Sequence, residues 1–212
     1  MITTQGNLSD WSQKYRPNSL EEMILPTSIK RPLITIRERK VGPHLLFHGK
    51  HGTGKTTAST LLFAPDRTKF SDVRGAINHH VVTSAIYHSH EFYRTRIRGV
   101  VVLDSVDQLA RKFFIELEQL AARHDLLGML ILTAALPKKI PPAIHSCVVS
   151  VNFDQMIGDA DLRQQMYVRM MEILENETLP RKDEVVRSIV LRWFPDMRQI
   201  VNRIQFEIGN HV

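Results

Sequence analysis

The sequence predicts an α/β fold in which a parallel β-sheet is flanked by helices and is followed by a small, wholly helical domain. Three observations indicate this fold: short apolar runs alternate with helix-like stretches, a glycine-rich segment follows the first run, and the periodicity becomes helical after Asn152. We therefore expect an α/β domain over residues 1–152 and a helical lid domain over residues 153–212.

Each predicted strand is a short run that is apolar on both faces and ends at polar or turn residues, which is typical of a buried parallel strand. These runs are Leu45–Phe47, Val100–Leu103, Met129–Leu132 and Val148–Val151. Residues 1–43 are polar and mixed, and their prolines are expected to break any long helix there. The prolines are Pro17, Pro26, Pro32 and Pro43.

From Asp161 onward, apolar residues recur at helical spacing and predict three successive helices. The three apolar faces are formed by Leu162, Met166, Met170, Ile173 and Leu174, then by Val185, Val186, Ile189, Val190 and Trp193, and last by Met197, Ile200, Val201, Ile204 and Ile208. Pro195-Asp196 is the start signal of the last helix. Because about 60 residues make only a small core, we expect these helices to dock on the α/β domain.

The composition excludes several classes of protein. With 43% hydrophobic residues the 212-residue chain can bury a core, and no apolar run approaches the roughly 18 residues of a membrane-spanning helix. The N-terminal residues MITTQGNLSDW lack the features of a signal peptide. The single cysteine, Cys147, excludes an internal disulfide framework and a cysteine-based zinc site. We therefore expect a soluble, cytoplasmic protein with no membrane contact.

Residues 49–56, GKHGTGKT, match the phosphate-binding pattern G-x-x-x-x-G-K-[ST] without a mismatch, after a strand and before Thr57–Leu62, which can be a helix. Loop N–H groups and the helix N-terminus would bind phosphates, Lys55 would reach the β- and γ-phosphates, and Thr56 would hold Mg²⁺. We therefore expect ATP and Mg²⁺ as cofactors, with a glycine-rich turn that mimics the pattern as the alternative. The predicted nucleotide-binding residues are Gly49, Gly52, Thr53, Gly54, Lys55, Thr56 and Thr57.

A carboxylate follows the apolar run Val100–Leu103. In a P-loop fold this Asp104 would coordinate magnesium directly or through water, and a loop aspartate without that role is the alternative. Many such ATPases carry Glu next, to orient the attacking water, but this chain has Ser105, whose hydroxyl is a poor base at neutral pH. Asp107 is a possible substitute, although a surface or capping role suits it better.

The chain resembles the clamp-loader AAA+ ATPases, and among them the large ATPase subunits of T-even-like bacteriophage clamp loaders. The resemblance begins with Trp11-x-x-Lys14-Tyr15-Arg16-Pro17 and Leu25-Pro26 ahead of the P-loop. It continues through Asp72–Gly75, Ile131–Ala134 at the position of the sensor-1 strand, Ile140–Cys147, and Phe194–Arg198 at the start of the sensor-2 helix.

The resemblance implies an AAA+ nucleotide-binding domain with a helical lid, in a subunit that opens a sliding clamp and places it on primed DNA with sibling subunits. By position it assigns ATP and magnesium binding to Lys55, Thr56 and Asp104. It adds Tyr15, Arg16 and Pro17 to the nucleotide site, Thr133 as sensor 1 and Arg198 as sensor 2. Arg198 also has a physical argument, because a cation in the first turn of a helix costs about 0.3–1 kcal/mol, which a bound phosphate would offset.

The chain departs from the family pattern at chemically important positions. Ser105 replaces the catalytic Glu, and His145-Ser146-Cys147 replaces Ser-Arg-Cys, so that the arginine finger is missing. Thr133-Ala134-Ala135 lacks the usual Asn, and the chain stops at Val212, where the family continues into a collar domain. Thr57 and Lys69 are too close in sequence for both the usual helix and the following edge strand. These departures predict weak or partner-dependent hydrolysis.

The net charge of +6 suits an anionic partner such as a nucleotide or a nucleic acid. The predicted DNA contacts are Lys69, Arg74, Arg94 and Arg96, with a solvated loop as the alternative for the run that ends at Arg98. For Lys69 the resemblance adds an argument, because the phage family has at this position a lysine that couples DNA contact to the acidic strand. His79, His80, His88 and His90 lie in a stretch that can be helical and lack a recognisable metal spacing, so we expect solvated or DNA-facing histidines. Two functions remain open: a clamp-loader-like ATPase subunit, or a hydrolysis-defective module that binds DNA or a replication protein.

Overall fold

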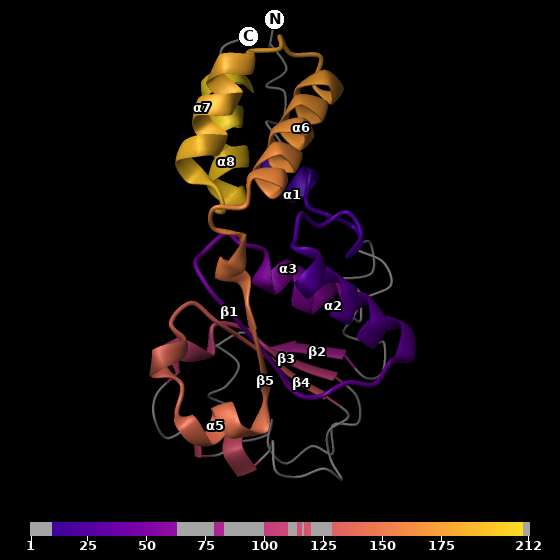
Figure 1. The fold of residues 1–212 in the computed structure, drawn as a ribbon, viewed down its shortest axis with the longest axis vertical. Helices are drawn as coiled ribbons and strands as arrows, with labels where there is room; N and C mark the ends of the chain where they lie inside the picture. The colour runs from indigo at the N-terminus through magenta and orange to yellow at the C-terminus, as the bar shows by residue number, and fades with distance from the viewer. Residues whose placement is uncertain are drawn as a thin grey trace, which may run out of the picture.

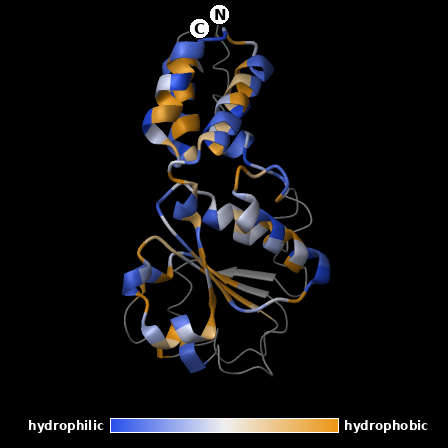
Figure 2. Cartoon of the chain, viewed as in Figure 1, coloured by the Kyte–Doolittle hydropathy of each residue, from blue (hydrophilic) through white to orange (hydrophobic). Residues whose placement is uncertain are grey.

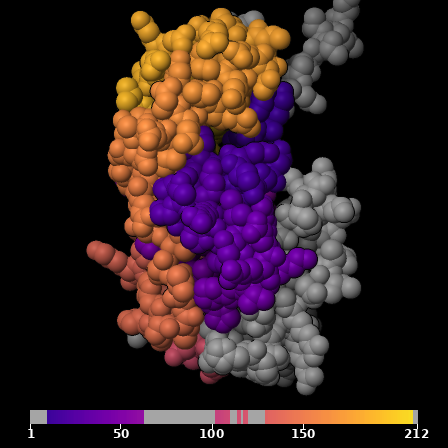
Figure 3. Space-filling view, turned by 45° about the vertical axis from the view of Figure 1, so that its right-hand side comes forward, coloured from indigo at the N-terminus to yellow at the C-terminus, as the bar shows by residue number. Residues whose placement is uncertain are grey.

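A computed structural model describes residues 10–62, 79–82, 100–109, 114–115, 117–119 and 129–209. It confirms the predicted α/β fold: a parallel sheet with helices beside it forms one part of the molecule, and the C-terminal helices form the other (Figure 1). The N-terminal segment lies between them, against both the sheet part and the C-terminal helices (Figure 3). This arrangement places the end of the first strand beneath the helical part.

The sheet has five parallel strands in the order β2-β3-β4-β1-β5. The strands are β1 (Leu45–His48), β2 (His79–Val82), β3 (Val100–Leu103), β4 (Met129–Ala134) and β5 (Val149–Asn152). All of β4 is buried, as expected for a run that is apolar on both faces of a covered parallel sheet. The four predicted strands are therefore confirmed, each within one or two residues at its ends.

β2 corrects the expectation that His79 and His80 can be helical. These residues instead pair with Val100 and Val101 at the edge of the sheet. A polar dipeptide gives no strand periodicity, so pairing with the apolar β3 decides its conformation. The edge strand also lies well beyond Lys69, which explains why the short spacing after Thr57 does not exclude it.

The helices beside the sheet are α2 (Thr27–Arg39), α3 (Lys55–Leu61) and α5 (Pro142–Cys147), whereas the short helix α1 (Trp11–Lys14) packs against the C-terminal helices. Short 3-10 turns η2 (Val106–Gln108), η3 (Pro137–Lys139) and η4 (Phe153–Met156) connect the strands to the following elements. α2 contradicts the expectation that prolines break any long helix there, because Pro32 lies inside it. Burial of Ile29 and Leu33 against the sheet side outweighs the backbone hydrogen bond that Pro32 cannot make.

The predicted helical lid consists of α6 (Ala160–Asn176), α7 (Asp183–Trp193) and α8 (Met197–Ile204), followed by the π-helical turn η5 (Gln205–Gly209). Asp159 and Asp196 cap α6 and α8 by accepting hydrogen bonds from Leu162 N and Gln199 N, each at 3.0 Å. Phe153 and Met156, just past residue 152, are buried among the sheet-side apolar residues. The exact division between the domains stays a prediction.

Apolar residues gather in the strands and along the facing sides of the C-terminal helices (Figure 2). The lid core is formed by residues of α6, α7 and α8 and by Trp11 of α1, which is only 5% exposed. Trp11 therefore joins the N-terminal segment to the lid. Within the part of the chain that the structure describes, no helix combines the length and apolarity needed to cross a membrane.

Candidate nucleotide-binding site

The P-loop leaves the end of β1 and leads directly into α3, as the sequence predicts. Gly49, Gly52 and Gly54 have φ values of 136°, 72° and 90°. Such left-handed backbone strongly favours glycine, and it lets the loop curl tightly above the end of the strand. The N–H of Gly49 donates to Ala134 O of β4 at 3.3 Å, so the base of the loop is anchored to the neighbouring strand.

Lys55, the first residue of α3, points back into the loop and is only 9% exposed. Its ammonium group donates to Gly49 O at 2.7 Å and to Lys50 O at 2.6 Å. Burial lowers the pKa of Lys55, and the nearby carboxylates of Asp154, Asp104 and Asp107 oppose that shift. The lysine is therefore held as a positive charge at the centre of the loop by backbone carbonyls and surrounding carboxylates.

Thr56, Asp104 and Thr133 come from three different elements and meet at one carboxylate oxygen. The hydroxyl of Thr56 donates to Asp104 Oδ1 at 2.9 Å, and the hydroxyl of Thr133 donates to the same atom. Thr133, which is 2% exposed at the end of β4, also accepts a hydrogen bond from Ser105 N at 2.9 Å. Thr133 therefore holds both Asp104 and the residue after it. This contact is compatible with the predicted sensor-1 role of Thr133, which stays a prediction.

Ser105 stands where the family has the water-orienting glutamate, and Asp107 is the nearby carboxylate considered as its substitute. Ser105 adopts a left-handed conformation with φ 58°, and both Ser105 and Asp107 line the pocket. Asp107 is 8% exposed and accepts a hydrogen bond from Leu136 N at 3.0 Å. The surface role considered for Asp107 is therefore wrong, because its buried carboxylate holds the loop that follows β4. The structure shows no helix cap at Asp107, which lies inside η2.

The pocket lies between the P-loop, the N-terminal segment and the lid, and has a volume of about 260 Å³. The predicted site residues that line it are Tyr15, Arg16, Pro17, Gly52, Gly54, Lys55, Thr56, Thr57, Asp104, Thr133 and Arg198. Gly49 and Thr53 do not line it. Thr53 is fully buried and donates to Lys50 O at 2.9 Å, so it shapes the loop from within.

The lid reaches the P-loop directly. Met197 N, at the start of α8, donates to Gly52 O at 3.1 Å. The next residue, Arg198, is exposed and lines the pocket from the first turn of α8. The lid therefore presents a cation to the pocket from a helix whose N-terminus contacts the phosphate loop.

The N-terminal segment connects the P-loop helix to the lid. Arg16 Nε donates to Thr57 Oγ1 at 3.0 Å. Lys14 Nζ and the hydroxyl of Tyr15 each donate to Glu177 Oε1 at 2.6 Å, at the C-terminal end of α6. These hydrogen bonds lower the pKa of Glu177, with the Lys14 bond as the larger cause. The segment 14–16 thus contacts both halves of the site.

Sequence reasoning missed residues that approach the site from outside the motifs. Arg169 and Glu22 line the pocket with apolar side chains from α6 and the N-terminal segment, and the methyl of Met23 packs against the P-loop at Gly54. Asp154 accepts a hydrogen bond from Lys50 N at 2.8 Å. The signal for Asp154 was available, because it closely follows a predicted parallel strand, at the sheet edge where ligand sites form.

The structure does not describe every residue that the sequence analysis singles out. Lys69, Arg74, Arg94 and Arg96 lie outside the described residues, as do His88 and His90 of the considered histidine metal site. Within the described ranges no group of three potential metal-binding His, Cys, Asp or Glu side chains occurs. His145 and Ser146 lie in α5, where the hydroxyl of Ser146 donates to Ala143 O at 2.7 Å.

No protein-family model matches the chain. In sequence it is 30% identical over 211 residues to the replication factor C small subunit of Methanococcus maripaludis, which covers 92% of this chain and 63% of that protein. The replication factor C small subunit of Aeropyrum pernix is 30% identical over 210 residues, or 92% and 61% of the two chains. The probable replication factor C subunit 5 of Caenorhabditis elegans is 27% identical over 226 residues, or 97% and 60%. The chain thus spans about three-fifths of the length of these relatives.

Among solved structures the chain is similar to two variants of RuvB from Thermotoga maritima. One has a TM-score of 0.69 and 16% identity over 90% of this chain and 64% of that chain. The other has a TM-score of 0.67 and 17% identity over 88% and 63%. At this identity the likeness concerns the fold. The chain therefore has the α/β P-loop fold of AAA+ proteins, and in sequence it is similar to subunits of replication factor C.

Proposed function

We propose that this chain binds Mg-ATP between its P-loop and its lid and acts as a clamp-loader subunit in DNA replication, with sibling subunits, a sliding clamp and primed DNA as partners. One observation carries the nucleotide assignment: Lys55, Thr56 and Asp104 converge beneath a pocket that the lid closes with Arg198. The similarity to replication factor C small subunits supports the clamp-loader role over a binding module without turnover.

The oxygen atoms present suit a magnesium ion. Thr56 Oγ1 and Asp104 Oδ1 lie 2.9 Å apart, and Mg²⁺ prefers a few protein oxygens together with phosphate oxygens and water. When bound there, the ion would neutralise charge on the transferred phosphoryl group. Thr133 keeps the Asp104 carboxylate oriented, while Lys55 and the loop N–H groups bind the phosphates.

Hydrolysis is proposed to be slow without a partner. Ser105 offers no carboxylate to orient water, and one oxygen of the pocket-lining Asp107 carboxylate accepts a hydrogen bond from Leu136 N. Ser146 occupies the position where the family carries a finger arginine, which is worth about 10³–10⁵-fold in rate. These features keep a hydrolysis-defective binding module as the second candidate.

The finer likeness to the large subunit of T-even-like bacteriophage clamp loaders rests on the ordered set of motifs from Trp11 to Arg198. It stays part of the proposal, as do the DNA contacts of Lys69, Arg74, Arg94 and Arg96. The positive net charge of +6 supports those contacts.

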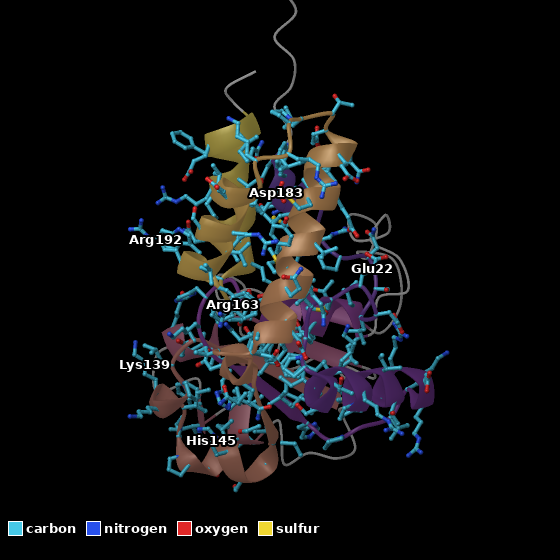
Figure 4. All side chains as sticks on the ribbon, turned by 45° about the horizontal axis from the view of Figure 1, so that its top comes forward. Glu22, Lys139, His145, Arg163, Asp183 and Arg192 are labelled. Atoms are coloured by element: carbon cyan, nitrogen blue, oxygen red, sulfur yellow. The ribbon has the colours of Figure 1, made fainter. Side chains whose placement is uncertain are left out.

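Thermal unfolding with and without excess Mg-ATP tests the nucleotide assignment. Ligand at about a hundredfold above its Kd should stabilise the fold by about 2.7 kcal/mol, a rise in Tm of about 5–10 °C. Lys55→Ala should remove most of that rise. The matched control is Lys139→Ala, because Lys139 is exposed on η3, points outward in Figure 4 and does not line the pocket. An unchanged melting curve of the wild-type chain in Mg-ATP would overturn the assignment.

Binding of primed or single-stranded DNA at several salt concentrations tests the nucleic-acid contacts. Affinity should fall steeply as salt rises, because phosphate contacts release counterions. Replacing Arg94 and Arg96 with Ala should flatten the logarithmic salt slope by about one to two units if both contact phosphate. Affinity independent of salt would contradict these contacts.

A further inference from the structure

Asp154 contacts the P-loop but does not line the pocket. It belongs to η4, directly after β5, and β5 pairs with β1 so that Asn152 lies opposite His48. Its backbone is held from two sides: Asp154 N donates to Asn152 Oδ1 at 2.9 Å, and the neighbouring Phe153 is fully buried against Phe47. The carboxylate therefore sits on a rigid strand end beside the start of the loop.

The contact between Asp154 and the loop is as close as the backbone allows. Asp154 Oδ1 accepts a hydrogen bond from Lys50 N at 2.8 Å. A Cβ atom on Gly49 would lie 3.0 Å from the same oxygen and 3.1 Å from Asp154 N, so a side chain at residue 49 would push the carboxylate away. The first loop residue thus has to be glycine for this contact as well as for its φ of 136°.

A single peptide group links this carboxylate to the loop lysine. The Gly49 carbonyl and the Lys50 N–H belong to one planar trans peptide, and they point in opposite directions. The N–H donates to Asp154 Oδ1, and the carbonyl accepts from Lys55 Nζ at 2.7 Å. An anion at one end and a cation at the other polarise the peptide in the same sense, which strengthens both hydrogen bonds.

We propose that Asp154 is a positioning residue of the nucleotide site, which holds Lys55 through the peptide between Gly49 and Lys50. This inference rests on the proposed binding of Mg-ATP, because Lys55 is the residue that reaches the phosphates. Asp154 is absent from the pocket lining, so it acts on the nucleotide through the lysine and the loop rather than by contact. Its negative charge also lies near Lys55 and balances the ammonium in the loop.

The first test measures Mg-ATP affinity by calorimetry for the wild type, Asp154→Ala and Asp154→Asn. Loss of a charge-assisted hydrogen bond should weaken binding about tenfold in Asp154→Ala. Asn keeps an acceptor oxygen without the charge, so Asp154→Asn should weaken it about threefold. Asp159→Asn is the control, since it removes one charge at the cap of α6 and should bind like the wild type. Wild-type affinity in both Asp154 variants would overturn the proposal.

The second test needs no nucleotide and therefore separates this inference from the proposed function. Urea unfolding is compared for Asp154→Asn, Lys55→Ala and the double variant. If Asp154 acts through Lys55, the losses of stability in the two single variants should not add. The double variant should then have a urea midpoint near that of the less stable single variant. Additive losses would contradict the link between the two residues. Wild-type protein that fails to bind Mg-ATP but shows this coupling would refute only the proposed function.

Discussion

The sheet side and the lid side of the pocket are built by different means. On the sheet side, Thr133 and Lys55 are nearly inaccessible, and their polar atoms are bonded to groups from neighbouring strands and loops. On the lid side, Arg198 is exposed at the first turn of a helix whose cap is the single residue Asp196. A buried polar group that loses its hydrogen-bond partner costs free energy, so its position has to be accurate. An exposed polar group can bond to water instead, so its position is less constrained.

The two sides meet through a small set of polar contacts. Met197 N, at the start of α8, donates to Gly52 O, and Trp11 N donates to Oε1 of Gln205, at the C-terminal end of α8, at 3.0 Å. Lys14 and Tyr15 add their bonds to Glu177. The sheet side therefore positions the phosphate- and magnesium-binding groups, whereas closure of the pocket depends on how the lid is attached.

The largest effect should come from Gly52→Ala, at the junction of the two sides. A Cβ there would lie 1.7 Å from Asp196 Oδ1, and the φ of 72° adds left-handed strain. The Asp196 carboxylate would have to leave its capping position, so we expect a loss of about 2–4 kcal/mol in unfolding free energy, measured in urea. Mg-ATP binding should weaken as well.

Gly158→Ala is the matched control for that prediction. Gly158 has a similar φ of 86°, but a methyl group added there would meet nothing within 4 Å, so the variant should show only the conformational cost of about 1–2 kcal/mol. Equal losses in the two variants would mean that the contact between the loop and the α8 cap adds nothing.

A smaller effect, on the sheet side alone, is expected from Ser105→Glu. Ser105 already adopts its left-handed backbone, so Glu brings no new backbone strain, while it supplies a carboxylate beside the pocket. Single-turnover hydrolysis should rise about tenfold or more, with little change in ATP affinity. A larger rise should need a partner that carries an arginine.

Ser105→Gln is the control, since it matches the size of Glu without its basicity and should leave the rate near that of the wild type. The opposite reading is that Asp107 already supplies the catalytic carboxylate. In that case the wild-type chain would hydrolyse ATP at a normal rate, Ser105→Glu would leave that rate unchanged, and Asp107→Asn would abolish it.

The smallest effect should come from Glu177→Gln, on the lid side. The hydrogen bond from Lys14 and then that from Tyr15 lower the pKa of Glu177 from its ordinary 4.5. A carboxyl with a lowered folded pKa stabilises the protein above its ordinary pKa, and this contribution is lost as the pH falls through the lowered value. We expect Glu177→Gln to lower Tm by no more than about 2 °C at neutral pH, less in high salt, because the pair is exposed. A Tm difference that persists at pH 2 would contradict this assignment.

Local sequence patterns are enough to predict the separate parts of the site. The GKHGTGKT segment specifies its own backbone through glycines and its own chemistry through Lys55 and Thr56, and Asp104 follows an apolar strand that has to be buried. Parallel strands end at one edge of a sheet, so these motifs had to come together. The helical periodicity after Asn152 likewise required apolar faces to pack against one another.

Other contacts are encoded by no local pattern and form because distant segments meet in the fold. Pro32 lies inside a helix because α2 buries its apolar side chains in the sheet-side core. His79 is in a strand because β3 lies beside it. Asp107 is bonded to Leu136 N, and Asp154 to Lys50 N, across long stretches of chain. The sequence around a loop aspartate looks the same whether its carboxylate faces water or a backbone N–H. Its partner depends on the strand end and the buried neighbours that set its position.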